Sequence, residues 1–268
     1  MNRTVLITGA SGGIGQATAL AFWQKGCKVV LHYHTHGDTS KALCYDMNKT
    51  RPQSAIALPA DANDHRLSLF ENIHPIPRGV SYNAYLLLDK KTALFDTVEK
   101  KLGTVDVLIN NAGIAQQKLF TDLSDDDWNR MFDINVKGMF YCCQRAAPAM
   151  IRQKRGKIIN VSSMWGQVGA SCEVHYSAAK GAVIAFTKAL AEELGPSGIQ
   201  VNCVAPGVID TPMNGHLSPD AIESLKEEAP LGTIGTPQDV AESILFLGSP
   251  ASDFITGQIL APNGGIVI

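Results

Sequence analysis

Two side chains capable of acid–base chemistry stand four residues apart in the segment HYSAAK, namely Tyr176 and Lys180. On a helix, residues four apart share one face, so the phenol and the ammonium group can act together. A tyrosine phenol has an ordinary pKa of about 10 and exchanges protons poorly at neutral pH unless a nearby cation stabilises the phenolate. Lys180 can supply that cation. A Tyr and a Lys at this spacing are also common in helices without a catalytic role.

Two further polar side chains could complete such a site. Ser163 follows the apolar segment KIINVSS, and a parallel sheet places its ligand-binding residues just beyond such strands. Its hydroxyl could donate a hydrogen bond to a carbonyl oxygen on which negative charge develops. Asn135 lies inside the helical pattern DWNRMFDINVKGMF, where an Asn side chain can equally bond the backbone or a water molecule. The serine therefore favours carbonyl chemistry, and the role of Asn135 stays open.

The glycine-rich segment TGASGGIG, from Thr8 to Gly15, follows an apolar strand pattern and opens a helix. Gly9, Gly13 and Gly15 allow a tight turn, a close approach of the backbone to a pyrophosphate, and contact between helix and sheet. Similar loops also occur as plain strand-to-helix turns. The position of this loop in the first strand–helix–strand unit favours a dinucleotide site.

The elements that must position these residues follow one pattern along the chain. Short apolar segments alternate with segments of helical period, which predicts an α/β fold with a doubly wound, mostly parallel seven-stranded Rossmann sheet and helices on both faces. The carboxyl ends of such strands share one edge, where ligands bind. Strands are predicted at Thr4 to Thr8, Lys28 to His32, Ser54 to Leu58, Val105 to Asn110, Lys157 to Val161, Gln200 to Ala205 and Gln258 to Leu260.

Two helices have recognisable ends. Ser124 followed by three aspartates predicts the N-cap of a long helix that continues to about Met150. Thr236 before Pro237 predicts another helix, which ends near Gly248. No internal repeat or linker divides the sequence, so we expect residues 1–268 to form a single domain.

One segment, at about residues 65–89, departs from the alternation. It lies before a helix predicted over Lys90 to Gly103 and contains two prolines. A connection of this length is unusual inside a compact domain. We interpret it as an atypical insertion, either a surface excursion or a lid over a substrate.

Composition excludes several classes of function. The chain has 268 residues, of which 45% are hydrophobic, and its 23 basic and 25 acidic residues give a net charge of -2. This balance indicates no nucleic-acid or anionic-membrane partner, and no apolar segment approaches the roughly 18 residues that span a bilayer. Six cysteines without metal-ligand spacing predict reduced thiols and no metal. Because a strand begins at Thr4, a signal peptide is not expected, and the default location is the cytoplasm.

Taken together, these motifs resemble the short-chain dehydrogenase/reductase family, and the resemblance covers nearly the whole chain. The spacing of Ser163, thirteen residues before Tyr176, is part of it. The matching positions are TGxxxGxG at Thr8, Gly9, Gly13 and Gly15; NNAG at Asn110, Asn111, Ala112 and Gly113; the helix residue Asn135; Ser163; Tyr176 and Lys180; and Ala205, Pro206, Gly207 and Thr211.

The resemblance implies a role for each of four catalytic residues. Tyr176 would be the general acid in reduction, Lys180 would lower its pKa and hold the nicotinamide ribose, and Ser163 would polarise the carbonyl group. Asn135 would anchor a water that relays protons through Lys180. Hydride itself would come from the cofactor. The implied cofactor-binding residues are Gly9, Ser11, Gly13, Ile14, Gly15, His34, Thr35, Asp61, Ala62, Asn111, Ala112, Gly113, Tyr176, Lys180, Pro206, Gly207, Ile209 and Thr211.

The tip of the second strand indicates which nicotinamide cofactor binds. An acidic residue there would bind the ribose 2′-hydroxyl of NAD, but the segment from His32 to His36 has no carboxylate before Asp38. We therefore expect NADP(H) rather than NAD(H), with His34 and Thr35 at the 2′-phosphate. Against this, Gly12 stands where many NADP-using relatives carry a basic residue.

Within the family, the resemblance is to 3-oxoacyl-(acyl-carrier-protein) reductases. It rests on VDVLINNAGI, on KRGKIINVSS and on the tail PLGTIGTPQDVAESILFLGSPASDFITGQILAPNGG. It implies NADPH-dependent reduction of a 3-oxoacyl thioester to the 3-hydroxyacyl product in fatty-acid synthesis. The same segments occur in reductases of free carbonyl compounds, sugars and polyols, which are the alternative. A remote alternative is a non-enzymatic NADP(H)-binding regulator.

The resemblance also implies partners. Acyl carrier protein is acidic, and the basic cluster Arg152, Lys154, Arg155 and Lys157 would either dock it near the cleft or form an ordinary solvated loop. A homotetramer is expected through the helices at about Ser124 to Met150 and Tyr176 to Leu194, together with the apolar C-terminal segment.

Overall fold

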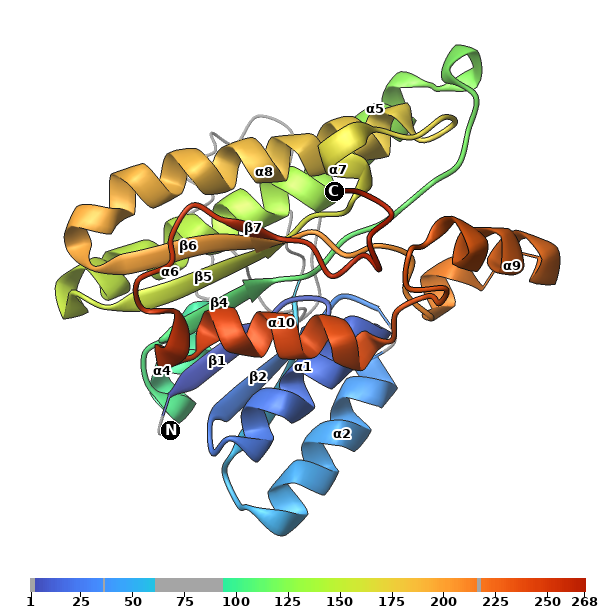
Figure 1. The fold of residues 1–268 in the computed structure, drawn as a ribbon. Coiled ribbons are helices and arrows are strands. Elements are labelled where there is room, and N and C mark those ends of the chain that lie inside the picture. The colour runs from blue at the N-terminus through green and yellow to red at the C-terminus, as the bar shows by residue number, and fades with distance from the viewer. Residues whose placement is uncertain (1–2, 36, 61–93, 216–217) are drawn as a thin grey trace, which may run out of the picture.

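A computed structural model of the protein describes residues 3–35, 37–60, 94–215 and 218–268. In this part of the chain, seven parallel strands form one sheet in the order β3-β2-β1-β4-β5-β6-β7 (Figure 1). The strands are β1 Thr4–Ile7, β2 Lys28–Tyr33, β3 Ala55–Pro59, β4 Val107–Asn110, β5 Gly156–Val161, β6 Ile199–Val204 and β7 Ile259–Leu260. The predicted doubly wound sheet is confirmed, with strand ends displaced by one or two residues.

Helices cover both faces of this sheet, which explains why its strands are apolar throughout. Side chains alternate between the faces of a strand, and Leu6 therefore belongs to one core while Val5 and Ile7 belong to the other. The first core packs under α4 Leu94–Leu102, α6 Gly138–Gln153 and α8 Val174–Leu194. The second packs under α1 Gly13–Gln24, α2 Gly37–Thr50 and α10 Pro237–Gly248. Figure 1 shows the two helical layers on opposite sides of the strands.

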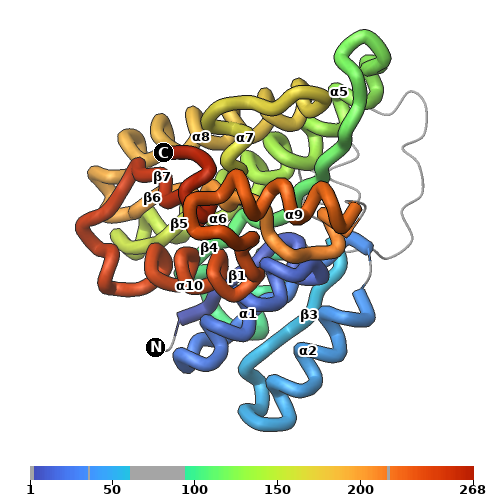
Figure 2. Tube along the Cα trace, turned by 45° about the vertical axis from the view of Figure 1, so that its right-hand side comes forward, coloured from blue at the N-terminus to red at the C-terminus, as the bar shows by residue number. Residues whose placement is uncertain are grey.

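The remaining helices lie toward the carboxyl edge of the sheet. They are α5 Asp125–Phe132, α7 Trp165–Val168 and α9 Pro219–Glu228, with 3₁₀ turns at Phe120–Asp122 and Pro212–Asn214. Two further 3₁₀ turns, Gly195–Ser197 before β6 and Pro250–Ser252 before β7, lie toward the amino edge. Figure 1 shows α9 projecting beyond the ends of the strands. In Figure 2, α2 and β3 form the opposite flank from β7.

The long helix predicted from Ser124 to about Met150 is interrupted in the structure. It begins as expected, because Ser124 Oγ accepts a hydrogen bond from the Asp127 backbone N–H at 3.2 Å and forms a capping box. A π-helical turn at Asp133–Lys137 then separates α5 from α6, which continues to Gln153. Inside that turn, the Asn135 side chain donates to the Met131 carbonyl at 3.0 Å. A side-chain amide competing for a helical carbonyl is a known cause of such breaks.

Several predictions concern residues outside the described ranges. These are the insertion at about 65–89 and the residues His36, Asp61 and Ala62. In the described part, all six cysteines are free thiols, and no group of His, Cys, Asp or Glu side chains could hold a metal ion. None of the described helices combines the length and the apolar character that crossing a membrane requires.

Candidate active site

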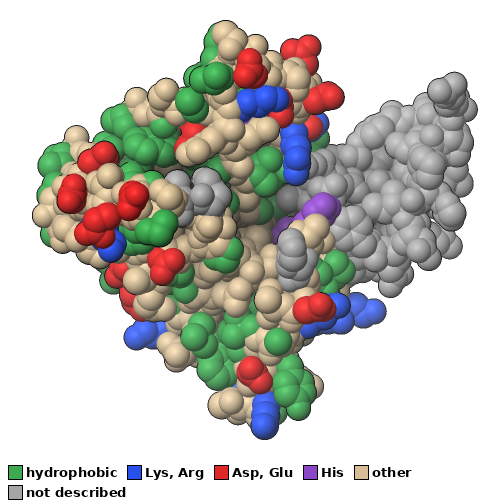
Figure 3. Space-filling model, turned by 90° about the vertical axis from the view of Figure 1, so that its right-hand side faces the viewer, with side chains coloured by type: hydrophobic (Ala, Val, Ile, Leu, Met, Phe, Trp, Pro, Cys, Tyr) green, Lys and Arg blue, Asp and Glu red, His purple; other side chains and the backbone are tan. Residues whose placement is uncertain are grey.

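A pocket of about 620 Å³ opens at the carboxyl edge of the sheet, and all four predicted catalytic residues line it. Ser163 follows β5, Tyr176 and Lys180 come from the first two turns of α8, and Asn135 comes from the π-helical turn. Figure 3 looks onto the end of the molecule that carries α9, where the surface is hollowed beside a lobe rich in acidic side chains. The fold therefore brings together residues spread over 46 positions of the sequence (135 to 180).

Ser163 and Tyr176 form the centre of the site. The Ser163 hydroxyl oxygen accepts a hydrogen bond from the Trp165 backbone N–H at 3.2 Å, so the hydroxyl proton can be directed toward Tyr176 or toward a substrate oxygen. Burial raises the pKa of Tyr176 to about 12, although its hydrogen bond with Ser163 acts in the opposite direction and the Glu173 carboxylate adds to the increase. The phenol is therefore neutral at pH 7 and carries a proton that it can give up.

Lys180 lies beneath the tyrosine ring. Its Nζ donates to the Val161 carbonyl at 3.0 Å and lies 5.7 Å from the centroid of the Tyr176 ring. Burial lowers the pKa of Lys180 to about 8. The expectation that Lys180 lowers the pKa of Tyr176 differs from the structure, in which burial of the phenol dominates. Lys180 is nevertheless within range to stabilise a phenolate once one forms.

Asn135 is held by the chain segment that follows β4. Its Nδ2 donates to the Ile114 carbonyl at 3.0 Å, and its Oδ1 accepts from the Ile114 backbone N–H at 3.3 Å. A methyl group built at Gly113 would lie 2.6 Å from Asn135 Oδ1 and 3.2 Å from Lys180 Nζ. Both side chains thus converge on the bare α-carbon of Gly113, which explains why this position must be glycine.

The glycine turn after β1 fits a dinucleotide. Gly9 has a φ of +66°, and a methyl group there would lie 2.8 Å from Ala112 Cα. At Gly15 it would lie 2.5 Å from the Gly9 carbonyl oxygen. Asn111 closes the turn by donating through Nδ2 to the Thr8 and Gly9 carbonyls, at 3.0 and 3.1 Å. The backbone segments of this turn pack against one another as closely as glycine permits. Such a turn leaves room for a pyrophosphate to approach the backbone.

The helix that follows the turn leaves its first amides available. Gly12, the N-cap of α1, provides no side-chain hydrogen bond, so N–H groups of the first turn can face an anion. The Ala10 N–H donates to the His32 carbonyl at 2.8 Å, which brings the end of β2 beside the turn. His34 and Thr35 follow β2 and are exposed. These residues therefore fit the adenosine half of a nicotinamide dinucleotide.

Apart from His34 and Thr35 at the end of β2, and Asp61 and Ala62 outside the described ranges, the predicted cofactor-binding residues divide into two groups. Besides Tyr176 and Lys180, those that line the pocket are Ile14, Asn111, Gly113, Pro206, Gly207, Ile209 and Thr211. Gly9, Ser11, Gly13, Gly15 and Ala112 instead build or support the turn beside it. Gly13 contributes by close packing, since a methyl group there would lie 3.3 Å from the Thr211 side chain.

Sequence reasoning missed the rest of the wall. These further lining residues are Ile114, Ala115, Gln116, Gln117, Val161, Ser162, Met164, Trp165, Glu173, Val208, Met213, Asn214 and Leu225. Position just beyond a strand could have indicated Gln116 after β4 and Trp165 after β5. No sequence signal indicated Leu225, because α9 reaches the pocket only through the tertiary fold.

The basic cluster expected near the cleft lies at the opposite edge of the sheet. Lys157 stands at the start of β5 and Ser163 beyond its end, about 20 Å apart at 3.3 Å per residue. The Lys157 ammonium group is buried against Ser252 and Asp253, at 3.0 and 2.9 Å. Arg155 pairs with Asp106 at 3.3 Å. The prediction of a docking site beside the cleft is therefore wrong, because helix α6 ends at the amino edge.

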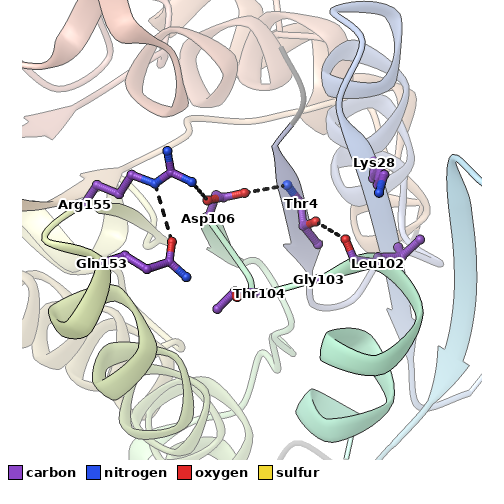
Figure 4. Close-up of a pocket in the computed structure, with 8 residues that line it drawn as sticks. All are labelled: Thr4, Lys28, Leu102, Gly103, Thr104, Asp106, Gln153 and Arg155. Atoms are coloured by element: carbon purple, nitrogen blue, oxygen red, sulfur yellow. Dashed lines mark hydrogen bonds and ion pairs between the residues drawn. The ribbon is translucent and has the colours of Figure 1, made fainter.

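Figure 4 shows a second pocket at this amino edge, of about 430 Å³. Asp106 accepts from the Thr4 backbone N–H at 2.9 Å, and the Thr4 hydroxyl donates to the Leu102 carbonyl at 2.9 Å. Its polar groups are thus largely bonded to one another, in contrast to those of the site at the carboxyl edge.

Comparisons with known proteins agree with this geometry. A family model described as short chain dehydrogenase matches residues 3–69, and one described as enoyl-(acyl carrier protein) reductase matches residues 89–267. A 3-oxoacyl-(acyl-carrier-protein) reductase from Thermotoga maritima is 38% identical over 266 residues, which cover 99% of this chain and 98% of the relative. The uncharacterised oxidoreductase YmfI from Bacillus subtilis is 37% identical over 265 residues and 99% of both chains.

Solved structures give the same result. The 3-oxoacyl-(acyl-carrier protein) reductase from Brucella melitensis superposes with a TM-score of 0.82 at 32% identity, covering 98% of this chain and 90% of the other. A putative gluconate dehydrogenase from Agrobacterium tumefaciens has a TM-score of 0.85 at 28% identity, covering 99% and 97%. The expected resemblance is confirmed: this chain belongs to the short-chain dehydrogenase/reductase family of nicotinamide-dependent oxidoreductases.

Proposed function

We propose that the protein reduces a 3-oxoacyl thioester carried on acyl carrier protein to the 3-hydroxyacyl product, with NADPH, in fatty-acid synthesis. The observation that carries this proposal is the neutral Tyr176 phenol, hydrogen-bonded to Ser163 in the wall of the pocket at the carboxyl edge. Relatives with that activity in their names, similar over nearly the full chain, support it.

In the proposed reaction the bound nicotinamide supplies the hydride. Tyr176 transfers its phenolic proton to the carbonyl oxygen, and Ser163 donates a hydrogen bond to the same oxygen as negative charge develops. The phenolate that remains is stabilised by the ammonium group of Lys180, which carries its proton at pH 7. Asn135 holds the backbone at Ile114 and keeps the space at Gly113 open, and we assign to it the water that returns a proton through Lys180.

The charges of the pocket favour an uncharged substrate. Among the lining residues that the structure describes, only Glu173 and Lys180 are charged, and Lys180 is buried and bonded to Val161. A substrate carboxylate would meet Glu173 without a free cation to pair with, which costs free energy in a partly desolvated site. Met213 and Leu225 add apolar wall. A neutral thioester with an acyl chain suits these surroundings.

For the cofactor, the end of β2 supports NADP(H). The first carboxylate after β2 is Asp38, in the first turn of α2. Its Oδ1 lies 4.0 Å from Lys41 Nζ, and both side chains are largely exposed. Among the described residues, therefore, no acid stands directly at the end of β2 to repel a 2′-phosphate, and we assign His34 and Thr35 to that phosphate.

A second candidate is the reduction or oxidation of a free polyol or sugar. The structural likeness to a putative gluconate dehydrogenase favours it, and the amides of Gln117 and Asn214 in the wall could bind hydroxyl groups. The Glu173 carboxylate would repel anionic sugars and polyols, such as gluconate. A non-enzymatic regulator is disfavoured because the four catalytic side chains converge on one pocket.

We further propose a homotetramer that acts in the cytoplasm. Trp128, Phe140 and Ile151, on α5 and α6, are each about two-fifths exposed, and an apolar helical face of this kind is suited to a subunit contact. At the C-terminus Ile268 is fully exposed. Cytoplasmic conditions would keep the six free thiols reduced.

The test is NADPH oxidation with acetoacetyl-acyl-carrier-protein and acetoacetyl-CoA at pH 7. We expect turnover with NADPH to exceed turnover with NADH, and Tyr176→Phe to lower kcat by about 10²- to 10⁴-fold because the proton donor is lost. Tyr45→Phe, at an exposed position on α2, is the matched control and should leave kcat unchanged.

Two further substrates separate the alternatives. Turnover of crotonyl-CoA would indicate reduction of a carbon–carbon double bond, and turnover of gluconate with NADP⁺ would indicate a polyol substrate. Turnover of gluconate but of no thioester would overturn the substrate assignment and leave the catalytic residues standing. Full activity of Tyr176→Phe would overturn the assignment of Tyr176 as the proton donor.

A further inference from the structure

A buried histidine beside the catalytic tyrosine has no part in the reaction proposed above. His175 is fully buried, and its Nε2 lies 2.9 Å from Gln116 Oε1. Gln116 lines the pocket. The contact therefore joins the first turn of α8, which carries Tyr176, to the segment after β4 that forms the opposite wall.

The hydrogen-bond network determines which atom donates. Gln116 Nε2 lies 2.9 Å from Asp127 Oδ1, and an ionised carboxylate can only accept. The lysine ammonium of Lys118, at 2.6 Å, together with Gln116 and Ser124, holds the pKa of Asp127 well below its usual range. Gln116 must therefore present Oε1 to the imidazole, and His175 must carry its proton on Nε2.

Asp127 is itself fixed from two sides. Its Oδ2 accepts the Ser124 backbone N–H at 3.0 Å in the capping box of α5, and it pairs with Lys118. The chain Asp127–Gln116–His175 thus runs from the start of α5, across the pocket wall, to the start of α8. Each bond has a charged or buried partner, which strengthens such a network.

The first turn of α8 needs such an anchor. Its N-cap residue, Glu173, makes no side-chain capping bond. The side-chain tie described on this turn's other flank is Ser177 Oγ, which accepts from the Ala170 backbone N–H at 3.1 Å. His175 and Tyr176 are adjacent and point about 100° apart around the helix. A rotation of this turn would therefore move the Tyr176 hydroxyl away from Ser163.

We propose that His175 is a positioning residue, whose Nε2–H bond to Gln116 fixes the Tyr176 hydroxyl against the substrate wall of the pocket. The proposal rests on the proposed role of Tyr176 as proton donor. A displacement of a catalytic group by about 1 Å can cost about 10²-fold in rate, so the effect belongs in kcat rather than in cofactor affinity.

Two substitutions of His175 form a matched pair. Gln places an amide nitrogen where Nε2 stands and keeps the donor, whereas Leu has similar size and no donor. The loop should stay attached in both, because the Lys118 backbone N–H still donates to the Cys172 carbonyl at 2.8 Å. We expect His175→Leu to lower kcat about tenfold or more with the Kd for NADPH within about twofold, and His175→Gln to remain within about threefold of wild type.

A double-mutant cycle isolates the bond. If His175 acts through Gln116, the kcat of His175→Leu/Gln116→Leu equals that of the worse single variant, whereas independent effects would multiply. Ser252→Ala, at the amino edge, controls for lost stability. Wild-type kcat in His175→Leu, equal loss in the Gln and Leu variants, or multiplied losses in the double variant would each overturn the proposal.

A measurement without turnover keeps the two proposals separate. Amide hydrogen exchange over 174–177 and 114–118 should be about tenfold faster in His175→Leu than in His175→Gln. Unchanged exchange would overturn the anchoring role even if the substrate assignment holds. Activity retained in Tyr176→Phe, with faster exchange in His175→Leu, would instead overturn only the role of the tyrosine.

Discussion

The two edges of the sheet carry pockets of comparable size but opposite character. At the carboxyl edge, Tyr176 and Lys180 are buried. Burial raises the pKa of Tyr176 and lowers the pKa of Lys180, and each shift favours the neutral form of the side chain. At the amino edge, Asp106 has an ion-pair partner in Arg155 and accepts the Thr4 backbone N–H at 2.9 Å. One edge thus holds groups ready to react, and the other holds groups already bonded.

The difference follows from the direction of the chain. Every strand here is parallel, so helices begin at the carboxyl edge and present free N–H groups there, as α1 does at Gly12. At the amino edge helices end, and their last carbonyls are satisfied locally, as when Thr4 Oγ1 donates to Leu102. A void at this edge is therefore poorer evidence of function than its volume suggests.

The largest expected contrast is between buried serines at the two edges. Ser163→Ala removes a donor to the developing oxyanion and should lower kcat by about 10²- to 10³-fold with little change in stability. Ser252→Ala removes a hydroxyl that accepts from Lys157 and donates to the Leu247 carbonyl. It should lower the free energy of unfolding by about 1–3 kcal/mol and leave kcat unchanged. Steady-state kinetics and denaturant unfolding of both variants measure these effects. A loss of stability without a loss of kcat in Ser163→Ala, together with a loss of kcat in Ser252→Ala, would contradict the difference between the two edges.

An intermediate effect is expected within the glycine turn. A methyl group at Gly15 would lie 2.5 Å from the Gly9 carbonyl oxygen, whereas at Gly12 the nearest atom is 3.6 Å away. Gly15→Ala should raise the Kd for NADPH about tenfold or more, because overpacking of 1–3 kcal/mol displaces the turn. Gly12→Ala should stay within about twofold. Titration by NADPH fluorescence measures both, and equal affinities would contradict the close-packed cradle.

The smallest contrast concerns pH. Lys180, with a pKa of about 8, loses its charge as the pH rises through that value, whereas Tyr176, with a pKa of about 12, stays protonated. Reductive kcat/KM should therefore halve near pH 8 and fall further above it. Burial also lowers the pKa of Lys157, at the amino edge, against the opposing effect of Asp253. Lys157→Met should leave the profile unchanged; a flat wild-type profile from pH 7 to 9.5 would show that Lys180 does not govern the rate.

Much of the fold could be predicted from local pattern. Segments such as TVLIT and KIINV are apolar at every position, and strands buried on both faces read in this way. The long helix was predicted less well, since the π-helical turn at 133–137 carries Asn135, whose side chain bonds not only to Met131 within the helix but also to Ile114, a residue 21 positions away. A local pattern carries no information about that contact.

The same limit applied to the basic cluster. Four cations near residue 155 suggested a docking face, but Lys157 turns inward to Ser252 and Asp253, almost a hundred residues later in the chain. The location of the cluster at the amino edge follows from the direction of the strands, which the predicted topology already gave. The charges alone did not place the cluster; the topology was needed as well.

By itself, the sequence determined the sheet, the glycine turn and the pairing of Tyr176 with Lys180, because each depends on residue type at short, regular spacing. Ser163 was indicated by its place just beyond a strand, and the role of Asn135 came only from the family resemblance. Only the tertiary structure decided the protonation preferences of Tyr176 and Lys180, since burial depends on everything packed around a group. It also decided that Leu225 reaches the pocket and that His175 bonds to Gln116. Contacts between distant segments are set by how whole elements pack, which no local pattern of residues records.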